Sequence, residues 1–122
     1  GNDTIILRGG SIAYGEEGDD IFIAYSGVCY GGIGNDTITR YGGSGVSYGG
    51  EGDDVFNIYS SNAKYFGEEG NDTFNIIGSL SGIVIDGGSG TNNVTGEVGS
   101  NTTINVVGAN SGSVSLVEKN SL

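Results

Sequence analysis

The sequence predicts an all-β protein, a parallel β-solenoid with about 18 residues per turn. Three observations predict this fold. A nine-residue motif recurs along the chain, and its copies begin at residues 14, 30, 48, 66 and 86, which is 16, 18, 18 and 20 residues apart. Short strand-like segments flank every copy, and no window has the apolar spacing of an amphipathic helix. Repeats of this kind bury their apolar side chains by stacking on one another.

Each motif runs from an aromatic or acidic residue through a glycine-rich acidic stretch to an apolar residue. Its copies read YGEEGDDIF, YGGIGNDTI, YGGEGDDVF, FGEEGNDTF and the weaker DGGSGTNNV, and GNDTI at residues 1–5 is the tail of a sixth. The segment that contains the motif keeps one length in every copy, whereas the loops between motifs vary as GGS, SG, GGSG and SSNA. A loop that coordinates a ligand tolerates no insertion, so the constant half is predicted to be the functional half.

Two short strands are predicted in each turn. IILR, IFIAY, TITRY, VFNIY and TFNII follow the motif loops, and SIAY, GVCY, GVSY, AKYF and IVID precede the next ones. Stacked turns would lie about 4.8 Å apart. The closing apolar residue of each motif should point into the core. These residues are Ile5, Phe22, Ile38, Phe56, Phe74 and Val94.

Six of the seven tyrosines fall into two columns of this repeat. The columns are Tyr14, Tyr30 and Tyr48, continued by Phe66, and Tyr25, Tyr41 and Tyr59. We interpret them as stacks between equivalent residues of successive turns. An aromatic surface that binds sugar or another protein is the alternative. Cys29 shares a column with Ala13, Ser47 and Tyr65, and a single cysteine in a chain without histidine indicates neither a disulfide nor a nucleophile.

Composition and charge restrict the possible partners. The 122 residues make at most one domain, and 26 glycines with a net charge of -11 place it near the boundary with disordered chains. Such a surface excludes nucleic acid and favours cations. No apolar run is long enough to span a bilayer, so membrane insertion is not expected. Because the chain begins without methionine, inside a motif, we expect an excerpt or a processed product.

Twelve of the fifteen acidic residues lie in the six motif loops: Asp3, Glu16, Glu17, Asp19, Asp20, Asp36, Glu51, Asp53, Asp54, Glu68, Glu69 and Asp72. Stacked turns would place one aspartate per loop in a single row with a spacing of about 5 Å. Calcium ions between the loops would remove the repulsion, because Ca²⁺ accepts six to eight oxygens from carboxylates and backbone carbonyls. A merely solvated acidic face explains neither the constant length nor the alignment.

The copies resemble the RTX (haemolysin-type) calcium-binding repeat G-G-x-G-x-D-x-U-x over residues 1–94. The resemblance implies a parallel β-roll with calcium between successive loops. The sixth place would give a carboxylate from Asp3, Asp20, Asp36, Asp54 and Asp72, and Asn92 replaces it in the last loop. The first four places would give carbonyls from Gly15, Glu16, Glu17, Gly18, Gly31, Gly32, Ile33, Gly34, Gly49, Gly50, Glu51, Gly52, Gly67, Glu68, Glu69, Gly70, Gly87, Gly88, Ser89 and Gly90.

The chain departs from this pattern in ways that shape the prediction. The alternate nonapeptide is degenerate, so ions are expected along one edge only, about four or five in number. Glu16 and Glu68 stand where the family has its second glycine. We expect each sixth-place aspartate, such as Asp54, to serve the two gaps beside it, and Asp53 to face solvent. Residues 95–122 carry no motif, and we read TTINVV and SVSLV as strands of ion-free turns that cap the roll.

These expectations together predict a calcium-binding structural module of a larger secreted bacterial protein, extracellular or at the cell surface. It would fold on calcium after export and serve as a folding, secretion or adhesin segment. Two alternatives remain: a subunit that stacks end to end on neighbouring copies in an extracellular filament or surface layer, and an auxiliary module of a secreted enzyme. No catalytic residue is predicted, because the carboxylates repeat identically. Ice binding would need threonines at the third place, which holds Glu17, Ile33, Glu51, Glu69 and Ser89.

Overall fold

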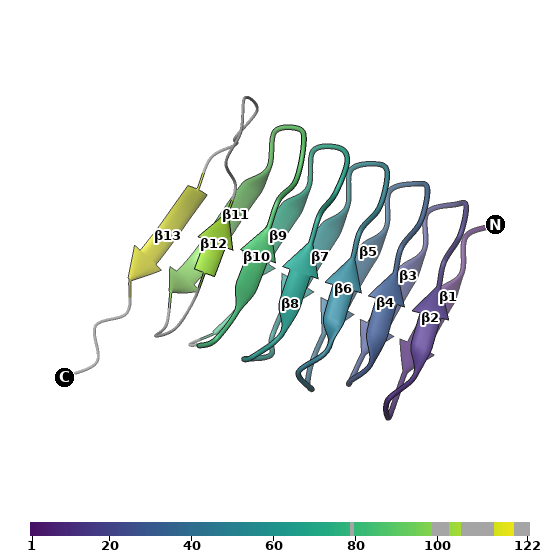
Figure 1. Ribbon diagram of the computed structural model, residues 1–122, viewed down its shortest axis with the longest axis horizontal. Coiled ribbons are helices and arrows are strands. Elements are labelled where there is room, and N and C mark those ends of the chain that lie inside the picture. The colour runs from purple at the N-terminus through teal and green to yellow at the C-terminus, as the bar shows by residue number, and fades with distance from the viewer. Residues whose placement is uncertain (79, 99–102, 106–113, 119–122) are drawn as a thin grey trace.

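The chain forms a parallel β-solenoid of two facing sheets in a computed structural model that describes residues 1–78, 80–98, 103–105 and 114–118 (Figure 1). This confirms the predicted fold class. The seven-stranded sheet contains β1 Thr4–Leu7, β3 Ile21–Ala24, β5 Thr37–Arg40, β7 Val55–Ile58, β9 Thr73–Ile76, β11 Asn93–Val98 and β13 Val114–Glu118. The six-stranded sheet contains β2 Ile12–Tyr14, β4 Val28–Tyr30, β6 Val46–Tyr48, β8 Lys64–Phe66, β10 Val84–Asp86 and β12 Thr103–Asn105.

Equivalent places of successive repeats pair with one another in parallel. Phe22 pairs with Ile38, Ile38 with Phe56, and Phe56 with Phe74, although the repeats differ in length. Alternate residues of β3 to β10 are buried and point inward, as the strand period of two requires. The predicted core column is confirmed, because Phe22, Ile38, Phe56, Phe74 and Val94 are fully buried. Its first member, Ile5, is half-buried at the end of the stack.

The motif loops run in one row along the upper edge of the solenoid in Figure 1, and the loops of variable length run along the lower edge. Each motif loop connects a strand of the six-stranded sheet to a strand of the seven-stranded sheet, as residues 49–54 connect β6 to β7. The register therefore stacks the loops on one another together with the strands.

The two tyrosine columns are stacked as the sequence predicts. Tyr14 and Tyr30 have ring centroids 4.9 Å apart with planes 8° from parallel, and Tyr30 and Tyr48 are 4.8 Å apart at 3°. In the other column, Tyr25 and Tyr41 also stack, at 5.8 Å. A ring stacked on both sides turns its edge outward, so the inner rings do not form the open platform on which a sugar stacks.

Arg40 lies inside the solenoid, which the repeat pattern did not reveal. It is fully buried, and its Nη2 donates to the carbonyls of Gly27 at 2.8 Å and Val46 at 3.3 Å and to the hydroxyl of Ser47 at 3.1 Å. Cys29 is buried beside it in the predicted column with Ser47, and burial raises the pKa of its thiol, while Arg40 and Ser47 oppose that rise. The buried guanidinium thus donates hydrogen bonds to carbonyls toward the edge opposite the motif loops.

The second place of the motif loop adopts a left-handed backbone whichever residue stands there. The φ angles of Glu16 and Glu68 are 68° and 69°, and those of Gly32 and Gly50 are 90° and 89°. A side chain in this region costs about 1–2 kcal/mol, because its Cβ crowds the following carbonyl. At Gly50, an added Cβ would also collide with the carbonyl oxygen of Gly32. The two glutamates are therefore accommodated at a cost that glycine avoids.

Substitutions at the second place should have opposite signs. We expect Glu68→Gly to raise the free energy of unfolding by about 0.5–1 kcal/mol, because relief of the left-handed strain exceeds the entropy cost of glycine. Gly50→Ala should lower it by about 2 kcal/mol or more. Urea denaturation at fixed calcium concentration measures both, and Glu69→Gln controls for the lost charge. Loss of stability in Glu68→Gly would contradict this account.

Candidate metal centre

The sixth-place residues form a single buried row at the motif edge. Asp20, Asp36, Asp54, Asp72 and Asn92 are each at most 1% exposed, whereas Asp3 is exposed. In each of the five buried residues, Oδ1 accepts the backbone N–H of the equivalent residue one turn earlier, at 2.7 to 2.8 Å. The predicted alignment of the aspartates is therefore present in the structure.

The other oxygen of each buried aspartate has no hydrogen-bond partner. This holds for Oδ2 of Asp20, Asp36, Asp54 and Asp72. A buried carboxylate oxygen without a donor costs several kcal/mol if the group stays ionised. The sequence led us to expect that one carboxylate serves the gaps on both sides. In the structure its two oxygens differ: Oδ1 is used by the preceding turn, and Oδ2 is left to interact with something else.

The first-place glycine brings Oδ2 close to the next loop. A Cβ atom on Gly15 would lie 2.5 Å from Oδ2 of Asp20 and 2.6 Å from the carbonyl oxygen of Gly31, so only glycine permits this approach. The same small space thus has a carboxylate oxygen of one loop and a carbonyl oxygen of the next beside it. Four such positions exist: Asp20 with Gly31, Asp36 with Gly49, Asp54 with Gly67, and Asp72 with Gly87.

The last loop shows which backbone carbonyls face the side chain at the sixth place. Asn92 Nδ2 donates to the carbonyls of Gly88 at 3.3 Å, Ser89 at 3.4 Å and Gly90 at 3.5 Å. It lies beside Gly87 as Oδ2 of Asp72 lies beside Gly67. Where the loop has asparagine, a donor meets the converging carbonyls. Where it has aspartate, oxygen faces oxygen, and only a proton or a cation complements the group.

The middle of each loop also joins its neighbours through the backbone. The third-place residues of successive loops form parallel bridges with one another, in the order Glu17, Ile33, Glu51 and Glu69. Ile33 N donates to the carbonyl of Glu16 at 2.8 Å, and the carbonyl of Ile33 accepts the N–H of Gly18 at 2.9 Å. Carbonyls of the first and fourth places are not acceptors in this ladder. In the loops that carry aspartate they are consequently the predicted carbonyl ligands that have both lone pairs available. In the last loop the fourth-place carbonyl of Gly90 accepts from Asn92.

A second ladder, which we did not predict, runs along the fifth place. Oδ1 of Asn2, Asp19, Asn35, Asp53 and Asn71 each accepts the N–H of the fifth place in the following turn, at 2.8 to 2.9 Å. Asp53 is exposed as expected, but it also links its turn to the next one. The signal was present in the sequence, because these five places hold only asparagine or aspartate, which share a short acceptor oxygen.

Burial raises the pKa values of three carboxyl groups in the sixth-place row. The pKa of Asp36 rises to about 6, that of Asp72 to about 7 and that of Asp54 to about 9, with the charges of neighbouring acidic side chains adding to the effect of burial. Hydrogen bonds to Oδ1 oppose the rise only in part. A cation beside Oδ2 would reverse these shifts, because opposite charge favours the ionised form.

The donor set suits a hard cation that accepts backbone oxygen. Among the described residues, no three aspartate, glutamate, cysteine or histidine side chains converge on one point, since each turn gives only one buried aspartate to the row. Most ligands would therefore be carbonyls. Calcium accepts such mixed oxygen sets in flexible geometry, whereas zinc prefers nitrogen and sulfur.

Comparisons with known proteins assign no family to the chain: no protein-family model, curated protein or solved structure matches it. The described part of the chain contains no helix long and apolar enough to cross a membrane. The predicted cap at residues 95–122 falls largely outside the described residues and stays a prediction. Within the described part of this segment, β12 and β13 lie where the sequence predicts strands.

Without metal ions, we expect the free energy of unfolding to fall as the pH rises from about 4 to about 9. The folded chain keeps protons on Asp36, Asp72 and Asp54 up to pH values of about 6, 7 and 9, whereas the unfolded chain releases them near pH 4. The stabilisation is complete below the unfolded pKa and is lost as the pH passes the folded values. Urea titrations in chelator across this range test it, and rising stability would contradict the burial of unpaired carboxyls.

Proposed function

We propose that the chain is a calcium-binding structural module of a secreted protein, an RTX-like β-roll whose motif loops hold Ca²⁺ along one edge. One observation carries this proposal. Four buried aspartate oxygens have no partner, and each lies beside a carbonyl of the next loop. Without metal a proton would satisfy such an oxygen, whereas a divalent cation would satisfy the ionised carboxylate together with the facing carbonyls.

The four positions between successive loops would hold one ion each. Calcium supplies positive charge there when bound. Asp54, for example, contributes Oδ2 and keeps its Oδ1 on the backbone N–H of Asp36, while Gly67 presents its carbonyl from the next loop. The count of four comes from the positions that have both groups. It agrees with the lower of the two numbers expected from the sequence.

The ions would supply most of the stability of the fold. At ten times its dissociation constant, a ligand that binds only the folded state adds about 1.4 kcal/mol, so four sites add about 6 kcal/mol. The whole free energy of unfolding of a typical domain is about 5–15 kcal/mol. The chain would therefore be poorly folded where calcium is scarce. Sites with dissociation constants on the order of 0.1–1 mM fit an extracellular module.

In this role the chain folds after export, outside the cell or at its surface. The ions join each loop to the next, so folding along the solenoid stiffens the chain as it emerges. This behaviour suits a folding and secretion element or an adhesin segment. The proposal assigns no catalysis to the aspartates, because every turn repeats the same arrangement.

A calcium titration tests whether folding depends on the ion. We expect the far-UV circular dichroism signal of β-strands to be weak in excess EDTA at pH 7.5 and to rise with a midpoint on the order of 0.1–1 mM calcium. Magnesium at equal concentration should be much less effective, because it demands shorter, octahedral coordination. A strand signal that stays unchanged in EDTA at this pH would refute the proposal.

The Asp54→Asn variant should separate calcium binding from the stability of the metal-free fold. The amide would donate to the loop carbonyls as Asn92 does, so in EDTA at pH 7 the variant should be more stable than the parent by about 2–4 kcal/mol, the cost of keeping a carboxyl with a pKa of about 9 in the core. Equilibrium dialysis should count one calcium fewer.

The matched control is Asp53→Asn. It removes the same charge one residue away, at an exposed position, and keeps the acceptor used by Asn71. We expect its calcium count to equal that of the parent. A lower count in both variants would mean that overall charge, and not the buried oxygen, holds the ions.

A further inference from the structure

The aromatic column on the outer face of the six-stranded sheet ends at Phe66. Tyr48 covers one face of the Phe66 ring, with centroids 5.2 Å apart and planes 15° from parallel. In the next turn, the residue paired with Phe66 is Asp86, so no ring covers its other face. A ring face carries the negative part of the aromatic quadrupole, and cations are attracted to it.

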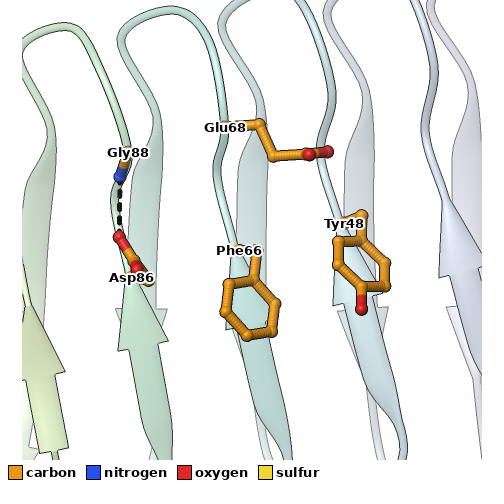
Figure 2. Close-up of a pocket in the computed structure, with 5 residues that line it drawn as sticks. All are labelled: Tyr48, Phe66, Glu68, Asp86 and Gly88. Atoms are coloured by element: carbon orange, nitrogen blue, oxygen red, sulfur yellow. Dashed lines mark hydrogen bonds between the residues drawn. The ribbon is translucent and has the colours of Figure 1, made fainter.

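A hollow of about 160 Å³ lies at this end of the column. Figure 2 shows its lining: Asp86 and Gly88 stand on one side of Phe66, Tyr48 stands on the other, and the Glu68 side chain extends above them. Oδ1 of Asp86 accepts the N–H of Gly88 at 3.1 Å, which holds the carboxylate in place. Among the described residues, neither Glu68 nor Asp86 forms an ion pair.

We propose that this hollow binds a guanidinium group, presented by an arginine side chain of a basic partner protein. Guanidinium is planar, stacks on aromatic faces and pairs with carboxylates, and the hollow is lined by the Phe66 ring and by the acidic residues Asp86 and Glu68. The net charge of -11 attracts a basic partner at long range. The site lies outside the row of buried aspartates, although Glu68 and Gly88 belong to motif loops whose carbonyls are proposed to bind calcium.

A sugar fits the same hollow less well. Sugars stack on aromatic rings, but their hydroxyl groups need donors as well as acceptors. The carboxylates of Glu68 and Asp86 accept hydrogen bonds and do not donate them, and the backbone N–H of Gly88 already donates to Asp86. The lining therefore favours a ligand that only donates and carries positive charge, which is the description of guanidinium.

NMR titration of the folded, calcium-saturated chain with N-acetyl-arginine amide tests the proposal. We expect shifts at the Phe66 ring and the Gly88 amide, and at least threefold weaker binding of the neutral isostere N-acetyl-citrulline amide. Asp86→Asn keeps an acceptor for Gly88 and should weaken arginine binding about threefold. Phe66→Leu should do the same, whereas Phe66→Tyr should bind as the parent does.

Three results would overturn the proposal. Equal affinity for the arginine and citrulline compounds would show that charge does not matter. Shifts at these residues with a neutral monosaccharide but not with arginine would assign the hollow to carbohydrate. Unchanged arginine binding in Asp86→Asn would place the ligand elsewhere, and this variant retains the whole aromatic column if Phe66→Leu fails to fold.

Discussion

The burial of one aspartate per turn, in a row of like charges, is the constraint on which the rest of the structure depends. Each carboxylate must find a partner for both oxygens in a space that excludes water. The preceding turn supplies a backbone N–H for one of them. The first-place glycine exists so that the other can approach the next loop, and the constant loop length keeps these groups in register. The acidic, glycine-rich motif is therefore unfavourable for an isolated loop, and we propose that a stack of loops makes it favourable by sharing cations.

The two edges of the solenoid solve the same problem in different ways. Carbonyl groups at either edge would be stabilised by a positive charge beside them. At the variable edge that charge belongs to the protein, since the guanidinium of Arg40 donates to Gly27 and Val46. Arg40 contacts one loop carbonyl, that of Gly27, and the loops along this edge differ in length. At the motif edge the positive charge is proposed to come from solution, and every loop must then keep the same geometry.

The repeat predicted the fold because spacing alone fixes which residues stack. Phe22, Ile38 and Phe56 could be assigned to the core without coordinates, since equivalent places of a parallel solenoid share one environment. The different roles of Oδ1 and Oδ2 in Asp54 could not, because they depend on the orientation of one carboxylate. The burial of Arg40 was not predicted, because a charged residue is normally expected to point toward solvent. The proposal of calcium rests on the family resemblance and on the unpaired Oδ2 atoms of the buried aspartates. Residue spacing by itself does not identify an ion.

The most direct measurement is a crystal structure grown with calcium, with anomalous data collected at a wavelength where calcium scatters strongly. The account predicts four anomalous peaks, one turn apart, beside Oδ2 of Asp20, Asp36, Asp54 and Asp72 and the first-place carbonyl of the next loop. Peaks confined to the exposed glutamates of the loop surface, or none at all beside these oxygens at neutral pH, would contradict it.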